Sequence, residues 1–160
     1  MASGVALSNQ CLDIYSDLQL RKKYWYIIYK LTDDLKEIVV DSVKERVKGD
    51  NLDAKVVFEE LAQKLIAAEN TVNEAGKKGE GRYAVLDVHY ETEGSRTLDK
   101  VVYLTWVPDT LPVKQKMLYA SSNKALRGKL TGIHVEIQCN DSSELKFDEI
   151  IETCRKKSRD

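Results

Sequence analysis

The hydrophobic pattern of the chain is helical in residues 53–69. Apolar residues recur there at spacings of three and four, which is the repeat of one buried helix face. They are Ala54, Val57, Phe58, Leu61, Ala62, Leu65 and Ile66. Residues 8–22 also predict a helix, with Ser8 placed to cap it, and its apolar side is formed by Cys11, Leu12, Tyr15, Leu18 and Leu20.

Five other stretches have the pattern of strands. Residues 24–31 (YWYIIYKL) are aromatic and β-branched, and the turn TDDLK leads from them into residues 37–43, so the two predict a hairpin. Residues 82–90 and 100–107 are strands separated by the polar loop ETEGSRTLD. Residues 133–138 alternate with period two, which indicates a strand with one polar face.

Residues 112–130 predict a helix whose two sides differ in kind. Pro112 suits the first turn, Asp109 and Thr110 offer capping oxygens, and Gly132 is a natural stop. At about 100° per residue, the side that faces the core is Leu118, Tyr119, Ser122, Leu126 and Leu130. The opposite side is Met117, Ala120, Lys124, Arg127 and Gly128, flanked by Lys114, Lys116 and Ser121.

The outer side of this helix combines an exposed Met with small and basic residues. A Met side chain adapts to irregular grooves, and small residues permit close backbone approach. Basic residues at the rim select an acidic partner and speed encounter. The combination favours a protein interface on this side of the helix. The alternative is that this side is an ordinary solvent-exposed surface.

The chain ends in a predicted helix after a capping box formed by Asp141 and Glu144. Its apolar side is Phe147, Ile150, Ile151 and Cys154, and its opposite side carries Glu149, Glu152 and Lys156. An ordinary charged surface is the simpler interpretation of that opposite side. The order of helices and strands predicts one α/β domain over residues 1–160, a central mixed sheet sandwiched between helices, with a flexible N-terminus at residues 1–7.

Composition narrows the classes of function. The net charge of −1 provides no overall field for nucleic acid or an anionic membrane. The sequence contains no run of 18 apolar residues, so it predicts no membrane-spanning helix. The first ten residues lack the pattern of a secretory signal. The three cysteines have no metal-ligand spacing with His89 or His134, so we expect reduced thiols and no metal. With no acid, base, nucleophile or phosphate loop in a recognisable pattern, we expect no enzyme and no cofactor.

Four segments resemble the ADF/cofilin family of actin-depolymerising proteins. They are MASGV at the start, TWVPDTLPVKQKMLYASS (105–122), ALRGKLTGI (125–133) and SSELKFDEIIE (142–152). The resemblance covers essentially the whole chain and implies the ADF-homology fold. It implies a cytoplasmic protein of the actin cytoskeleton, with nuclear presence left open. Such a protein binds actin monomers and filaments, prefers the ADP form, and severs and depolymerises filaments without covalent catalysis.

The resemblance also implies two binding surfaces and a regulatory site. The surface for monomers and filaments would comprise Ser3, Gly4, Lys114, Lys116, Met117 and Arg127. The surface used only on filaments would comprise Lys100, Glu152 and Lys156, with Arg96 as a substitute for a basic position. Ser3 matches the family's phosphorylation site, which implies a kinase and a phosphatase as partners. We expect a monomer whose basic face also meets phosphoinositide headgroups.

Three positions depart from the family pattern. Lys124 stands where many relatives have an acidic residue, and Leu98 and Thr153 stand where basic residues occur. The filament surface is therefore less well matched than the monomer surface. The alternative function is that of a coactosin-like or glia-maturation-factor-like relative, which binds only filaments or the branching complex. The Ser3 terminus and the Lys-x-Lys-Met helix start argue against that alternative.

Overall fold

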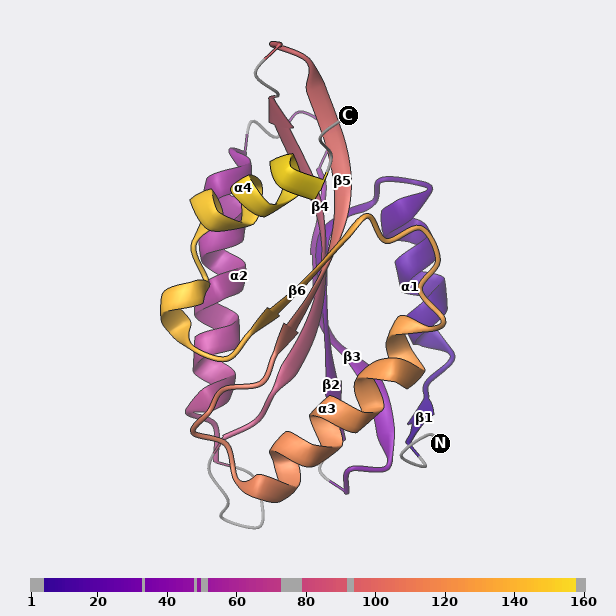
Figure 1. The fold of residues 1–160 in the computed structure, drawn as a ribbon. Coiled ribbons are helices and arrows are strands. Elements are labelled where there is room, and N and C mark those ends of the chain that lie inside the picture. Colours follow the sequence, from indigo (N-terminus) through magenta and orange to yellow (C-terminus); the bar gives the residue numbers. More distant parts are fainter. Residues whose placement is uncertain are drawn as a thin grey trace.

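A six-stranded mixed sheet runs through the middle of the structure, and helices cover both of its faces (Figure 1). The computed structural model describes residues 5–32, 34–47, 49, 52–72, 79–91 and 94–157. The strands are β1 (Ala6–Leu7), β2 (Tyr24–Leu31), β3 (Glu37–Glu45), β4 (Arg82–Glu91), β5 (Thr97–Trp106) and β6 (Val135–Cys139). The helices are α1 (Gln10–Gln19), α2 (Ala54–Glu69), α3 (Val113–Arg127), the 3-10 turn Ser142–Glu144 and α4 (Phe147–Lys157).

The strand order is β1-β3-β2-β4-β5-β6. The four central strands pair antiparallel, whereas β1 on β3 and β6 on β5 are parallel pairs at the two edges. A parallel pair needs a crossover connection, and α3 supplies it between β5 and β6. The helix that carries the candidate interface is therefore held against the sheet by its connections at both ends.

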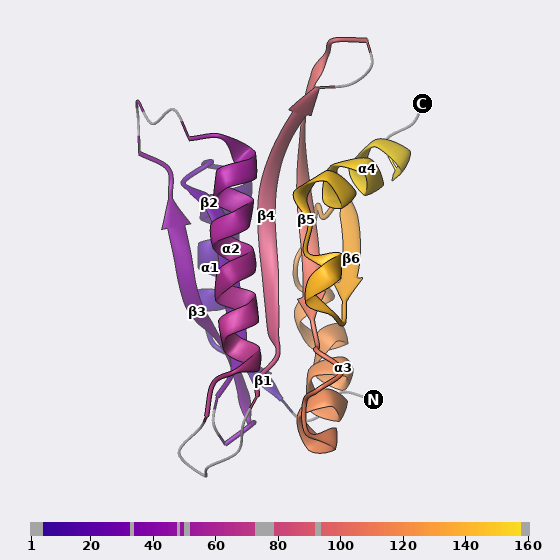
Figure 2. The ribbon, with the colours of Figure 1, turned by 90° about the vertical axis from the view of Figure 1, so that its left-hand side faces the viewer.

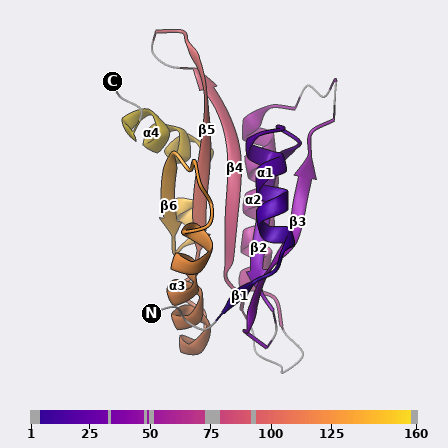
Figure 3. The same cartoon turned by 90° about the vertical axis from the view of Figure 1, so that its right-hand side faces the viewer.

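Two hydrophobic cores lie on the two faces of the sheet. On β4, Ala84 and Leu86 belong to the core under α2 and α4, whereas Tyr83 and Val85 belong to the core under α1 and α3. This alternation follows from the two-residue repeat of a strand. Figures 2 and 3 show the two covered faces from opposite sides. The predicted single α/β domain with a mixed sheet between helices is confirmed.

Most predicted elements agree with the structure within a few residues. The strand predicted at 24–31 matches β2, and the helix predicted at 53–69 matches α2 with Asp53 as its N-cap. The Asp53 carboxylate accepts a hydrogen bond of 3.0 Å from the Lys55 amide, which satisfies one free donor of the first turn. No helix in the described ranges has the length and apolar composition needed to cross a bilayer.

Several predicted helix ends are corrected. Asn9, not Ser8, is the N-cap of α1, and its side chain makes no capping bond. At α3 the N-cap is Pro112, again without a side-chain bond, while the Thr110 hydroxyl donates to Glu69 instead. Asp141 and Glu144 cap the short 3-10 turn that precedes α4 rather than α4 itself.

Two strands also differ from the prediction. Residues 1–7 were expected to be a flexible end, but Ala6 and Leu7 form β1 and pair with Glu37 and Ile38 of β3. Residues 1–4 lie outside the described part of the chain. Strand β5 begins at Thr97, three residues earlier than predicted, because pairing with β4 extends to Glu91.

The sheet separates at one end. The β2–β4 pairing ends at Tyr26 and Leu86, whereas β4 and β5 continue together as a two-stranded ribbon (Figure 2). At this separation the buried Asp87 carboxylate lies 3.1 Å from the Lys22 ammonium and 3.2 Å from the Arg46 guanidinium. These ion pairs connect the ribbon to the strands that diverge from it.

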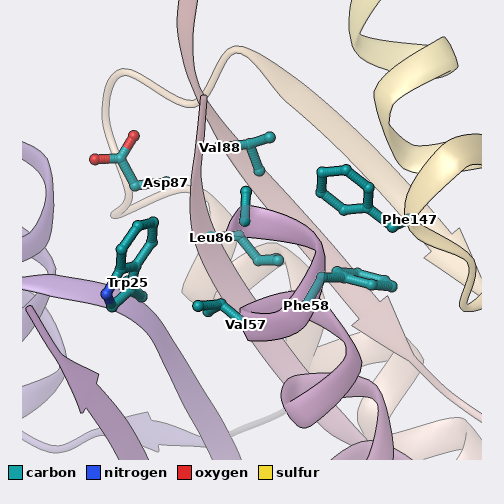
Figure 4. A pocket seen from close by; sticks show the side chains of 8 residues that line it. Trp25, Val57, Phe58, Leu86, Asp87, Val88 and Phe147 are labelled. Atoms are coloured by element: carbon teal, nitrogen blue, oxygen red, sulfur yellow. The ribbon is translucent and has the colours of Figure 1, made fainter. Parts of the chain in front are cut away.

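A small pocket lies beside the separation, between α2, α4 and the sheet (Figure 4). Its lining is Trp25, Ala54, Val57, Phe58, Leu86, Asp87, Val88 and Phe147. The Asp87 carboxylate and the Trp25 ring nitrogen both point away from the apolar side chains. Because a ligand site needs a few convergent polar groups to orient its ligand, we interpret this pocket as a packing gap.

Candidate functional site

Helix α3 contacts the sheet through the side that its sequence pattern predicts. Tyr119, Ser122 and Leu126 are buried, as is Leu130 just after the helix. The expectation is inexact at Leu118, which is only half-buried, while the polar Gln115 is 7% exposed and faces inward instead. The periodicity therefore identifies the correct face but not every residue of the contact.

Tyr119 is the principal anchor of α3. Its hydroxyl oxygen accepts a hydrogen bond of 3.0 Å from the Leu31 amide, and its ring packs on Tyr83 with centroids 5.3 Å apart. Gly81 leaves room for this ring, because a Cβ there would lie 2.9 Å from both the Tyr119 ring and the Trp106 carbonyl oxygen. Burial raises the pKa of Tyr119 to about 12, so the phenol stays neutral at physiological pH. The helix is thus fixed by packing and by a buried polar contact.

The outer side of α3 exposes two large apolar side chains one turn apart. Met117 is 66% exposed and Val113 is 70% exposed. Val113 is not among the residues predicted for this side, although its position four residues before Met117 places it there on a helix. Burying two such side chains in a partner's groove would contribute about 1.5–3 kcal/mol each. This exposed pair is the apolar part of the candidate interface.

Two lysines border the exposed pair. Lys114 is exposed, and Lys116 is half-buried with its ammonium donating a hydrogen bond of 3.2 Å to the Asp109 carbonyl. The small residues Ala120 and Ser121 continue the same side and are exposed. The surface composed of Val113, Lys114, Lys116, Met117, Ala120, Ser121 and Lys124 is called the α3 face below.

Arg127 lies at the end of α3, off its buried side as predicted, and its side chain is engaged within the molecule. Its guanidinium forms an ion pair with Glu136 of β6, and its Nη1 donates a hydrogen bond of 3.0 Å to the Leu130 carbonyl. The side chain is 31% exposed and is directed along its own molecule. The predicted group of Lys114, Lys116 and Met117 is thus brought together, but Arg127 is bound elsewhere.

The predicted residues Ser3 and Gly4 lie outside the described residues. Val5, the first described residue, is 8% exposed and belongs to the same core cluster as Leu111 and Tyr119. Strand β1 also contacts α3, and the two lie together in Figure 3. The described chain therefore begins beside α3.

The four residues predicted for the second surface gather at the other end of the molecule. Lys100 shares its side of β5 with Leu98 and Val102, which belong to the core under α4. Burial raises the pKa of Cys154 on α4 to about 11, and the charge of Lys100 opposes that rise, which indicates that the two side chains are near each other. Glu152, Lys156 and Arg96 are all exposed.

The C-terminal end of α4 is tied to the β4–β5 ribbon. The Arg155 guanidinium donates a hydrogen bond of 3.2 Å to the Glu91 carbonyl, and the Tyr90 hydroxyl donates one of 3.4 Å to the Cys154 carbonyl. Figure 1 shows the ribbon and α4 at one end of the molecule and the start of α3 at the opposite end. The structure therefore separates two groups of candidate residues whose relative positions the sequence left undetermined.

A sequence model of the Cofilin/tropomyosin-type actin-binding proteins matches residues 4–155. The chain belongs to the cofilin/ADF family. It is 39% identical to Cofilin-1A of Dictyostelium discoideum, over 98% of this chain and 99% of that protein. It is 38% identical to a cofilin of Gibberella zeae, over 96% and 95% of the two chains. The crystal structure of Plasmodium berghei actin depolymerization factor 2 superposes with a TM-score of 0.78 at 28% identity, covering 96% of this chain and 99% of that one.

Two departures of this cofilin/ADF chain from the family pattern have structural roles. Leu98 packs against the core under α4, and the Thr153 hydroxyl donates a hydrogen bond of 3.0 Å to the Glu149 carbonyl. Neither position therefore presents a cation. Lys124, the third departure, is exposed on the α3 face.

The cysteines of this family member are buried and unpaired. Burial raises the pKa of Cys139 to about 12 and also raises that of Cys11. Because the thiolate is the reactive form, these side chains act as packing groups. Across the described ranges, no group of three or more His, Cys, Asp or Glu side chains is arranged to hold a metal ion.

Proposed function

We propose that this protein binds actin monomers and filaments through the α3 face, together with Ser3 and Gly4, and that it severs and depolymerises filaments. The observation that carries the proposal is the exposed pair of Val113 and Met117, bordered by lysines, on a helix that Tyr119 anchors rigidly. A rigid helix with an apolar stripe fits a hydrophobic groove, and its lysines fit an acidic rim. Membership of an actin-binding family supports actin as the partner that has this groove and this acidic rim.

The proposed activity is one of differential binding, without a covalent step. A ligand shifts an equilibrium only through its different affinities for the two states. A protein that contacts two neighbouring subunits through separate surfaces would favour one relative orientation of those subunits. If that orientation differs from the one in a bare filament, binding weakens the contacts at the boundary. Preference for ADP-actin would likewise mean a higher affinity for the ADP form than for the ATP form.

Co-sedimentation with filaments, combined with a fluorescence titration of monomeric actin in its ADP and ATP forms, tests the proposal. We expect binding in both assays, tighter binding to the ADP form, and more free filament ends as the protein is added. Binding to filaments alone would instead support a coactosin-like function. Binding to neither would refute the proposal.

We predict that the second surface acts only on filaments. In the variant K100A/K156A, monomer binding should be unchanged, whereas filament affinity should fall about fivefold and severing should decrease. The difference from the parent should shrink as ionic strength rises, because salt screens the contacts that Lys100 and Lys156 make in the parent. Filament co-sedimentation at two salt concentrations provides the measurement.

The same variant can contradict the two-surface arrangement. Equal loss of monomer and filament binding would indicate one continuous site. The variant K55A/K64A removes two lysines of α2 that are assigned to neither surface, and serves as the matched control. Adding R96A to this variant tests whether Arg96 takes the place of the basic residue that relatives have at position 98. If it does, filament binding should fall further.

Ser3 is proposed as the regulatory phosphorylation site. A phosphate there would add a charge of about −1.5 to −2 beside a face whose partner is acidic. We predict that Ser3→Glu lowers affinity for monomeric actin about tenfold and leaves the melting temperature unchanged. Ser3→Ala is the control, and a Glu variant that binds like Ser3→Ala would show that this switch does not operate.

The cytoskeletal setting of the family supports a cytoplasmic location, and nuclear presence remains open. We further propose that phosphoinositide headgroups compete with actin for the lysines of the α3 face, since both partners are anionic. A kinase and a phosphatase acting on Ser3 would complete the set of partners.

A further inference from the structure

We propose that Lys124, and not Arg127, is the cation with which the C-terminal half of α3 contacts a carboxylate of actin, and that Arg127 is a positioning residue. This inference rests on the proposed function of the α3 face and specifies the partner that the face fits. It follows from where the two side chains lie on one helix.

Lys124 lies on the α3 face in line with Met117. Lys124 lies seven positions after Met117, which is about two helical turns, so the two side chains share one side at a distance of about 10 Å along the axis. Lys124 is exposed, and in the described part of the chain no ion pair involves it. Its ammonium is therefore available to a partner that approaches over Met117.

Arg127, one turn further on, is held by its own molecule. Its ion pair with Glu136 joins the end of α3 to β6, and its bond to the Leu130 carbonyl satisfies one of the acceptors left free after a helix. Its Nε and Nη1 are the nitrogens held in this way, and turning the guanidinium outward toward a partner would break both contacts. The cost of leaving Glu136 and the carbonyl unpaired would offset much of any new ion pair.

The loop after α3 is fixed by further contacts to α1. The Tyr15 hydroxyl and the Gln19 side-chain amide both donate to the Thr131 carbonyl, the second at 2.9 Å. Gly132 follows with φ of +83°, and a Cβ there would lie 1.9 Å from the Gln19 amide nitrogen. Arg127, Glu136, Tyr15 and Gln19 thus form a clamp that sets the direction of the last turns of α3, and hence the place of Lys124.

The partner's surface can be described from this geometry. The cations of the α3 face are Lys114, Lys116 and Lys124, spread over about 15 Å of helix axis. The α3 face carries no acidic side chain. A complementary surface has an apolar groove for Val113 and Met117, and a carboxylate about 10 Å beyond the position of Met117. Acidic side chains of actin are the group we assign to Lys124.

The first experiment reverses the charge at Lys124. We expect K124E to weaken binding to monomeric ADP-actin about tenfold, to make the affinity less sensitive to salt, and to leave the melting temperature unchanged. The control K55E makes the same change in net charge on α2, on the other side of the sheet, and should bind like the parent. An unchanged affinity in K124E would overturn the inference.

The second experiment separates positioning from contact at Arg127. We expect R127A and E136Q to weaken monomer binding to a similar extent, about twofold to threefold, because each breaks the same ion pair. The charge-swapped variant R127E/E136R should recover the part of the affinity that depends on the ion pair, although a carboxylate at position 127 cannot donate to the Leu130 carbonyl. If R127A weakens binding while E136Q does not, or if the swapped variant fails to recover, then Arg127 contacts actin directly and its assignment as a positioning residue is overturned.

The outcome also distinguishes this inference from the proposed function. If K114A/K116A weakens binding while K124E does not, the α3 face binds actin but Lys124 has no part in it. If neither variant weakens binding, the site assignment itself is wrong and the inference fails with it.

Discussion

Removing both lysines at the start of α3 should lower the affinity for monomeric and filamentous actin by at least about thirtyfold. Lys114 and Lys116 border the exposed pair of Val113 and Met117, so a partner that covers the apolar pair also desolvates the two ammonium groups. Each desolvated charged contact contributes roughly 1–3 kcal/mol. The sum of two such losses gives the thirtyfold change.

The fold should survive the double substitution K114A/K116A. Neither side chain belongs to a core cluster, and Ala favours a helix at least as well as Lys does. The substitution removes the hydrogen bond from the Lys116 ammonium to the Asp109 carbonyl, which lies at the surface. Titration of labelled actin monomers and filament co-sedimentation measure the binding, and thermal unfolding checks the fold. With K55A/K64A as the matched control, unchanged monomer affinity would remove the α3 face as the site.

Replacing Tyr119 by Ala should destabilise the protein by roughly 3–5 kcal/mol, as large-to-small changes of buried aromatic residues do. Its ring is 1% exposed and fills the space left by Gly81 beside Tyr83. The substitution also leaves the buried Leu31 amide without its acceptor, which adds a desolvation cost. A loss of this size is a large fraction of the roughly 5–15 kcal/mol by which ordinary domains are stable.

Urea unfolding of Tyr119→Ala and Tyr119→Phe separates the two contributions. The Phe variant keeps the ring but not the acceptor, so its loss should be about 1–3 kcal/mol. The folded fraction of the Ala variant should bind actin weakly, because α3 has lost its anchor to the sheet. A loss below about 1 kcal/mol for Ala would contradict the role of Tyr119 as the principal anchor.

Local patterns in the sequence determined much of the fold. The repeat in residues 53–69 predicts α2 nearly to the residue, and the aromatic and β-branched run at 24–31 predicts β2. The buried and exposed sides of α3 were also correctly predicted, including the exposure of Met117. These features depend on residues three, four or two positions apart, whose geometry the helix and strand repeats impose.

The fold around these elements was decided by contacts between distant segments. Ala6 and Leu7 have no strand pattern of their own and become β1 because β3 offers an unpaired edge. Strand β5 extends back to Thr97 because β4 continues to pair with it beyond the end of β2. Such pairings are set by the partner strand rather than by the residues of the segment itself.

The two candidate surfaces were likewise determined partly by local sequence and partly by contacts between distant segments. The sequence itself places Lys114, Lys116 and Met117 on one helix turn, and so predicts that they act together. It does not show that the charge of Lys100 is near Cys154 of α4, a helix some fifty residues later in the chain, or that Glu136 pairs with Arg127. Side chains far apart in sequence meet only where the sheet order and the crossover of α3 bring their elements together. The tertiary structure therefore decided which cations of α3 are left exposed, such as Lys124, and which are bound within the molecule, such as Arg127.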